Sequence, residues 1–322
     1  MSFIVEFSWL LVVIMIIAFA CEFMDSSLGM GYGTTLTPVL LIFGFDTMKI
    51  VPAVLISEFV TGLVSAIFHA IFKNFKLGQK DRVETKMAFN PENLPDSSPG
   101  SGVNTSKSIK YEQNSFSEMV NNLTRDTKVV FILALFGVVG TIVSAVISVV
   151  FSYSAAFKFA VKIYIGVMVL AMGIIILIFR NRDMKFSYRK IVSLGVLAGF
   201  NKGLSGGGYG PITVSGQILA GRDGKNAIAS TSLAESIVCF VGITAYVITN
   251  VVTMYKGGEG ITWEYLGLAP YLMIGAVLSA PLAALTTKTI EGKWLKLLVG
   301  IVTVLLGIFT LVWQILQYTG VV

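Results

Sequence analysis

The chain has 322 residues, of which 55% are hydrophobic and only 13% are charged, and its mean hydropathy is +0.80. This composition excludes an ordinary soluble globular domain and indicates a polytopic membrane protein. The formal net charge of +6 is concentrated between the apolar stretches, so it reports membrane topology and does not predict a nucleic-acid partner.

Apolar stretches along the chain predict an all-α polytopic fold with eight to ten helices. Segments 34–45 and 211–220 are long enough for only about half a bilayer at about 1.5 Å per residue, whereas the later segments of each half can cross it. Each half therefore has three full spans and two shorter pieces. The expected helices are roughly 7–24, 34–45, 50–72, 129–152 and 157–180 in the first half, and 189–202, 211–220, 226–250, 265–287 and 293–317 in the second.

A glycine-rich segment occurs twice, at a constant offset of 177 residues. Phe23–Gly33 aligns without a gap on Phe200–Gly210, and eight identities fall within 36 positions. This pattern indicates a tandem duplication in which each copy carries a break between apolar segments. The identical pairs are Phe23/Phe200, Gly29/Gly206, Gly31/Gly208, Tyr32/Tyr209, Gly33/Gly210, Gly44/Gly221, Asp46/Asp223 and Glu58/Glu235.

Further along the chain, the offset between matching residues falls from 177 to 135, as in the match of Gly140 with Gly275. The first half therefore carries 42 extra residues, and the polar composition of 73–128 places them there. We expect a first repeat over 1–72 and 129–186, a polar, flexible cytoplasmic insertion over 73–128, and a second repeat over 187–322.

The charges of the connecting segments predict how the halves are oriented. Segments 73–128 and 180–190 are rich in basic residues, so the positive-inside tendency places them in the cytoplasm. A parallel second half would place only Lys256 on that side, against two acidic residues. An inverted second half places five basic residues there: Arg222, Lys225, Lys288, Lys293 and Lys296. We therefore predict inverted repeats with both termini outside the cytoplasm, in which the two short pieces of each half are re-entrant or cross twice.

The two glycine breaks predict a substrate site, because broken helices at matching places in two repeats are typical of transporters. Helices that restart at Thr34 and Pro211 present free N–H groups and a positive dipole end, which favour a small anion. The alternative is that these glycines only permit close helix packing. The candidate substrate-binding residues are Gly29, Gly31, Tyr32, Gly33, Thr34, Asn201, Lys202, Ser205, Gly206, Gly207, Gly208, Tyr209 and Gly210.

Charged residues inside the apolar segments are candidates for coupling or gating. Glu58 and Glu235 match each other, and each is either a proton-exchanging group or a structural group that ties a helix to the break. Asp25 and Lys202 also occupy matching positions. Either they form an ion pair with each other, or Lys202 attracts the anion. The only histidine, His69, is expected at the membrane interface. The full set of coupling or gating candidates is Asp25, Glu58, Glu235, Ser57, Thr231 and Ser232.

The chain resembles the TauE/SafE sulfite exporter family in three segments. These are the glycine breaks at Gly29–Gly33 and Gly203–Pro211, and Ala229–Leu233, which follows the second break. The resemblance covers the chain outside 73–128. It implies export of sulfite, organosulfonates or related sulfur-containing anions, coupled to an ion gradient. The first copy departs from the pattern, since Asp25–Ser27 stands where a glycine-rich start is usual.

We therefore predict a secondary transporter in the cell membrane that exports a small sulfur-containing anion, with coupling to protons left open. An anion-selective channel or a membrane solute receptor is the alternative. Gly203–Gly206 also spells the Gly-x-Ser-Gly of an intramembrane serine hydrolase, but the only histidine lies in the other half. We expect no enzyme activity, no cofactor, no metal and no nucleic acid. The expected partners are the anion and the lipid bilayer, and a homodimer is left open.

Overall fold

The computed structural model describes residues 9–29, 31–78, 123–152, 154–179, 188–219, 222–257, 263–289 and 292–320. These residues form ten α-helices and a short 3-10 turn, with no strand among them, which confirms the all-α prediction. In the first half the helices are α1 (Trp9–Leu28), α2 (Tyr32–Ile42), α3 (Thr47–Ile71), α6 (Arg125–Val150) and α7 (Ala155–Phe179). In the second half they are α8 (Tyr188–Ser205), α9 (Tyr209–Leu219), α10 (Gly224–Gly257), α11 (Ala269–Thr289) and α12 (Gly292–Tyr318), with the turn η2 (Glu264–Leu266) before α11.

Six helices of the described chain are long and apolar enough to cross a membrane: α1, α3, α6, α7, α10 and α11. Five of them were predicted as full spans. The sixth, α1, is longer than expected because it continues to Leu28. α12 was also predicted as a full span, and it is an apolar helix of 27 residues.

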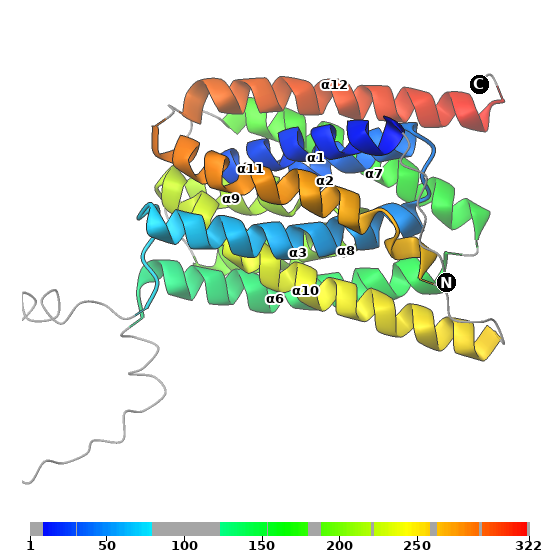
Figure 1. Ribbon diagram of the computed structural model, residues 1–322, viewed down its shortest axis with the longest axis horizontal. Helices are drawn as coiled ribbons and strands as arrows, with labels where there is room; N and C mark the ends of the chain where they lie inside the picture. The colour runs from blue at the N-terminus through cyan, green and yellow to red at the C-terminus, as the bar shows by residue number, and fades with distance from the viewer. Residues whose placement is uncertain are drawn as a thin grey trace, which may run out of the picture.

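The pairing of the helices is unchanged when the two halves are exchanged. α1 packs along α11, and α8 packs along α6 in the same way. α3 packs against α10, and α7 against α12, so each of these helices contacts its own counterpart. In Figure 1, α3 runs from right to left and α10 from left to right, and the same reversal relates α6 to α11. An inverted duplication requires these directions, although the duplication itself and the orientation in the membrane stay predictions.

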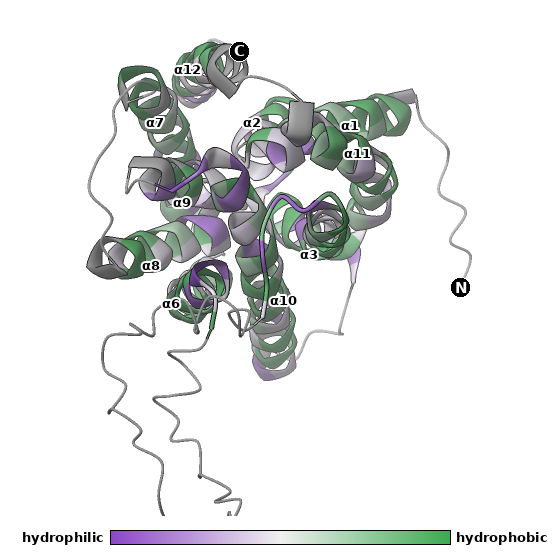
Figure 2. Cartoon of the chain, turned by 90° about the vertical axis from the view of Figure 1, so that its left-hand side faces the viewer, coloured by the Kyte–Doolittle hydropathy of each residue, from purple (hydrophilic) through white to green (hydrophobic). Residues whose placement is uncertain are grey.

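Apolar side chains cover the outer faces of the bundle. Phe131, Leu278 and Leu305 expose 63%, 65% and 62% of their surface, as expected of side chains that contact lipid. Figure 2, which looks along the bundle, shows hydrophobic outer faces on most helices and hydrophilic segments towards the centre and the near ends. The polar groups that matter for function therefore lie between the helices.

The loop between α2 and α3 is held by Asp46, which lies outside the spans. Its carboxylate accepts a hydrogen bond from Met48 N–H over 2.9 Å and pairs with Lys158 of α7 over 3.0 Å. Partial burial alone would raise the pKa of Asp46, but these two contacts outweigh it and lower the pKa below its usual value. The pair ties the end of the first hairpin to α7.

The ends of the expected insertion are part of the bundle. α6 begins at Arg125, four residues before the predicted start, and Asn74 and Phe75 are buried. Thr124 N–H donates a hydrogen bond to the Gly78 carbonyl oxygen over 2.9 Å, and Gly78 N–H donates to Thr127 Oγ1 over 3.0 Å. The prediction of a flexible segment between these ends falls on residues 79–122, outside the described chain.

We expect thiol labelling to reveal the predicted orientation. Single cysteines at Lys76 and Lys225 should react with a membrane-impermeant reagent only after permeabilisation, whereas a cysteine at Lys256 should react in intact cells. Lys225 and Lys256 lie in the first and last turns of α10, which runs from one end of the bundle to the other (Figure 1). Lys76 lies near the start of α10, since its N–H group and the Asn226 amide both contact Asp126. All three side chains are exposed, and the native Cys21 and Cys239 are buried and give little background. Labelling of positions 76 and 256 from the same side would contradict the inverted arrangement.

Candidate functional site

Each break is a turn made by two glycines with positive φ angles. In the first break Gly29 and Gly31 have φ angles of 68° and 146°, and in the second the matching Gly206 and Gly208 have 74° and 81°. Residues with a Cβ rarely adopt such angles, so these identities between the two copies have a conformational cause. α2 and α9 begin directly after these turns, two residues earlier than predicted.

The two breaks are in direct contact with each other. Gly208 N–H donates a hydrogen bond to Thr34 Oγ1 over 3.0 Å. A Cβ on Gly207 would lie 2.6 Å from the carbonyl carbon of Gly33, and a Cβ on Gly33 would overlap the carbonyl oxygen of Gly206. Glycine thus serves close packing here, as the alternative interpretation expected. The starts of α2 and α9, far apart in the sequence, converge at this contact.

The two matching tyrosines brace the breaks. Both Tyr32 and Tyr209 are fully buried. The hydroxyl of Tyr32 hydrogen-bonds Ser57 Oγ of α3 over 2.7 Å, and that of Tyr209 donates to the Leu133 carbonyl oxygen of α6 over 3.0 Å. Tyr32, Ser57 and Tyr209 are therefore engaged by the protein itself in this conformation.

The first backbone donors of α2 are capped by carboxylates. Tyr32 N–H donates to Asp25 Oδ1 over 3.4 Å, and Gly33 N–H donates to Glu58 Oε1 over 3.2 Å. Negative charge at this position is favoured by the positive end of the helix dipole. The start of α2 therefore already binds anionic groups, which the protein supplies from α1 and α3.

The start of α9 lacks such a cap. The N–H groups of Tyr209 and Gly210 make no hydrogen bond to any residue of the described chain, and both residues are buried. The amide of Asn201 lies beside them, with Nδ2 at 3.4 Å from the position that a Cβ on Gly208 would take, while its Oδ1 accepts a hydrogen bond from Tyr164 OH. Hydrogen-bond donors therefore gather at this helix start.

Lys202 joins the two matching glutamates. Its Nζ forms an ion pair with Glu58 of α3 and lies 2.7 Å from Glu235 Oε1 of α10, and its side chain is only 1% exposed. The alternative in which Lys202 pairs with Asp25 is not found among the described ion pairs. Lys202 thus connects α8 to α3 and α10.

Glu22 is a buried acidic residue that the sequence analysis did not single out. It is 1% exposed, and its carboxylate accepts hydrogen bonds from Ser26 Oγ over 2.5 Å and from Thr61 Oγ1 over 3.1 Å. The matching position in the second half is Gly199, so a search for charges shared by both halves passes over Glu22. A carboxylate within an apolar helix was the signal that points to it.

A sequence profile described as sulfite exporter TauE/SafE matches residues 114–310, more than half of the chain, including the second break. The chain belongs to the TauE/SafE family. It is also 23% identical over 314 residues, 97% of its own length and 86% of the relative's, to a Bacillus subtilis (strain 168) protein described as "Probable membrane transporter protein YtnM". Together with the six candidate spans, these matches identify a multi-pass cell-membrane protein of a transporter family.

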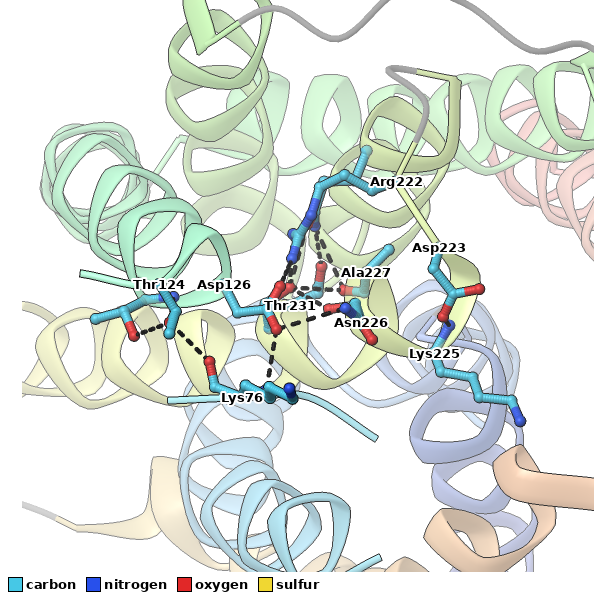
Figure 3. A network of polar contacts seen from close by, with 12 residues as sticks. Lys76, Thr124, Asp126, Arg222, Asp223, Lys225, Asn226, Ala227 and Thr231 are labelled. Carbon is cyan, nitrogen blue, oxygen red and sulfur yellow. Dashed lines mark hydrogen bonds and ion pairs between the residues drawn. The ribbon is translucent and has the colours of Figure 1, made fainter. Parts of the chain in front are cut away.

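This TauE/SafE protein has a second buried ion pair, at the end of the hairpin formed by α8 and α9 (Figure 3). Arg222 pairs with Asp126 at the start of α6 and donates to Ser230 Oγ over 2.9 Å. Gln217 Nε2 donates to Thr231 Oγ1 over 2.7 Å in the same cluster. Thr231, a coupling candidate, is thus bonded within this cluster, and Arg222, which the sequence analysis counted only as a topological charge, is a buried structural residue.

His69, which was expected at the membrane interface, lies in the last turn of α3 and faces the interior of the protein. His69 is fully buried, with Nε2 at 3.0 Å from the Ser26 carbonyl oxygen and Nδ1 at 2.8 Å from Asn74 Nδ2. The end of α3 is covered by residues 72–78 and by α11, whose Ala284 carbonyl oxygen accepts from Asn74. His69 therefore fastens α3 to the last turn of α1.

Ser205 has the contacts of a residue that shapes the turn of the second break. Its Oγ donates to the Asn201 carbonyl oxygen over 2.7 Å and accepts from Gly207 N–H over 3.2 Å. The described hydrogen bonds of His69 go elsewhere, so they do not join this serine to the histidine that a hydrolase would need as its base.

Proposed function

We propose that this TauE/SafE protein is a secondary transporter that exports a small sulfur-containing anion, such as sulfite or an organosulfonate. The observation that carries the proposal is the convergence of two helix starts at the contact between the breaks. Positive helix ends and backbone N–H groups form ready anion sites, and broken helices at a repeat interface are where transporters bind their substrates.

The start of α9 supports an anion site of defined composition. The buried N–H groups of Tyr209 and Gly210 have no partner in the described chain, and each such group costs about 1–3 kcal/mol. An oxyanion bound there would accept from both groups and from Asn201 Nδ2. We propose this point as the centre of the substrate site, with the donors of α2 as its second wall.

A cavity between α3, α6 and α7 supports a route to this site. It extends from Lys158 at the start of α7 to Leu204, within the second break. Thr47, Ser148, Ser152 and Tyr246 line it as well. A lysine and four hydroxyl-bearing residues, without a carboxylate among the lining residues, favour the passage of an anion.

Asp25 and Glu58 support coupling of the anion to protons. In this conformation their carboxylates occupy the N–H donors of α2 that an anion would use. Protonation of either carboxyl group removes the negative charge that holds it there, and the donors become available to the substrate. Proton binding and anion binding then favour each other, because both relieve the same competition.

Reconstitution tests this proposal. Proteoliposomes loaded with unlabelled anion should accumulate labelled sulfite or a short sulfonate by counterflow, with saturation, and should accept chloride poorly. Asn201→Asp is nearly isosteric and places a carboxylate beside the proposed anion, so counterflow should fall by at least about tenfold, since like charges in contact cost several kcal/mol.

The matched control is Gln317→Glu, which makes the same amide-to-carboxylate change at an exposed position of α12 and should leave counterflow unchanged. Flux that rises linearly with concentration and does not depend on a gradient would favour the channel alternative. Full counterflow in Asn201→Asp would remove the second break from the substrate site.

A further inference from the structure

A second cavity, between α1, α3 and α10, is lined mainly by acidic and hydroxyl-bearing residues. Glu22 and Asp25 of α1, Glu58 of α3 and Glu235 of α10 all line it, and hydroxyl groups and Gly62 complete the wall. Four carboxylates exclude this cavity as a place for an anionic substrate.

The described residues supply one basic side chain to these four carboxylates. Lys202 pairs with Glu58 and Glu235, and the described ion pairs include neither Glu22 nor Asp25. Charges buried within the membrane are costly unless they are paired, so the cluster must bind positive charge beyond that of Lys202. A proton is the smallest way to supply it.

Ser65 indicates that the cavity holds a further hydrogen-bonding group. Its side chain is fully buried and lines the cavity, and its Oγ has no hydrogen-bond partner in the described chain. A buried hydroxyl without a partner is unusual, and an ordered water in a polar cavity is the common way to satisfy it. A water there would connect Ser65 with the carboxylates that line the same space.

Of the four carboxyl groups, Glu22 is the one whose described contacts include neither an ion pair nor a backbone N–H group. Glu58 and Glu235 are engaged by Lys202, and Asp25 accepts from the start of α2. Glu22 accepts only from two hydroxyl groups, Ser26 Oγ and Thr61 Oγ1. Besides these acidic groups, the titratable neighbours are Cys21 on α1, Tyr32 on α2, His69 on α3 and Cys239 on α10, while α11 contributes the Thr287 hydroxyl at the last turn of α1.

We infer that Glu22 takes up and releases the coupling proton, and that a water held by Ser65 carries the proton between Glu22 and the carboxylates of Asp25 and Glu58. The proton moves from the Glu22 carboxyl group to one of these carboxylates, which leaves Glu22 ionised and the acceptor neutral, so charge is conserved. This inference rests on the proposed function, since it supplies the proton that releases the α2 donors to the anion.

The inference is tested by measuring uptake driven by a pH gradient and exchange of substrate for substrate separately. Purified wild type and Glu22→Gln would be reconstituted, with a short sulfonate as substrate because its own charge does not change over the pH range used. Counterflow should stay within about twofold of wild type, because exchange needs no net proton movement. Uptake driven by an imposed pH gradient should fall at least about tenfold, since a positioned proton-transfer group contributes about 100-fold or more.

Glu264→Gln makes the same change at an exposed position of η2 and should leave both fluxes unchanged. Ser65→Ala provides a second test that does not depend on the folding of Glu22→Gln. A merely structural Ser65 predicts no loss, since its hydroxyl has no protein partner, whereas the proton path predicts slower driven uptake with intact counterflow.

Driven uptake at the wild-type rate in Glu22→Gln overturns the inference while the proposed function stands. Equal loss of driven uptake and counterflow in a folded variant also overturns it, because Glu22 would then act in substrate binding. Uptake driven by a Na⁺ gradient and unaffected by pH would assign the cavity to a metal cation instead. Absence of counterflow in the wild-type protein would refute the proposed function itself, and the inference with it.

Discussion

Gly33→Ala should abolish transport and strongly destabilise the protein. A Cβ at this position would overlap the carbonyl oxygen of Gly206 and lie 2.9 Å from the Cα atom of Gly207. Both obstacles are backbone, which cannot rotate away as a side chain can. We expect a loss of about 3 kcal/mol or more, because the two halves of the chain must separate to make room. The midpoint of thermal unfolding in detergent measures this loss.

Gly224→Ala is the control for this prediction. Gly224 is the first residue of α10, and a Cβ there would meet nothing within 4 Å. Alanine is the better helix former, so the thermal midpoint should stay the same or rise slightly. A Gly33→Ala protein as stable as Gly224→Ala would show that the breaks separate easily.

Lys202→Met should destabilise the protein because it leaves Glu58 and Glu235 buried without a countercharge. Removal of one partner from a buried ion pair typically costs about 3–5 kcal/mol. The loss should be largely reversed when Glu58→Gln and Glu235→Gln are added, since none of the three side chains of the two ion pairs is then charged. Thermal midpoints of the single and triple variants measure both effects.

Lys158→Met is the matched control for Lys202→Met. Its pair with Asp46 leaves the two side chains 39% and 37% exposed, so its loss should cost at most about 1 kcal/mol. If Lys202 served mainly to attract the anion, Lys202→Met would keep its stability and lose only transport. That result would contradict the structural role assigned to the ion pairs with Glu58 and Glu235.

The positions of the helices could be predicted from sequence because long apolar stretches, and the glycines that interrupt them, are local signals. The breaks were placed correctly for the same reason, since residues with a Cβ rarely adopt the φ angles found at Gly29 and Gly206. The first-half insertion was set too wide, because Asn74 and Asp126 are polar residues that become buried only through contacts with distant helices.

The partners within the site could not be predicted, because they depend on how helices from the two halves pack. Lys202 contacts Glu58 and Glu235 only when α3 and α10 lie against each other. The sequence analysis did not single out Glu22 because it looked for charged residues that occur at matching positions in both halves. A site that uses different residues in the two halves cannot be found in this way. The same inequality appears at the helix starts, where α2 is capped by carboxylates and α9 is not.

The hydrogen bonds that join Gly78 to Thr124 and Thr127 close the chain on itself at the edge of the bundle. The chain therefore leaves the bundle at Gly78 and returns to it at Thr124, directly beside the point where it left. Doubling the length of a flexible segment whose ends are held together costs only about 0.6 kcal/mol in closure entropy. We therefore expect a change in the length of this segment to have little effect on the stability of the bundle, and the junction is a suitable place to graft a fluorescent reporter domain.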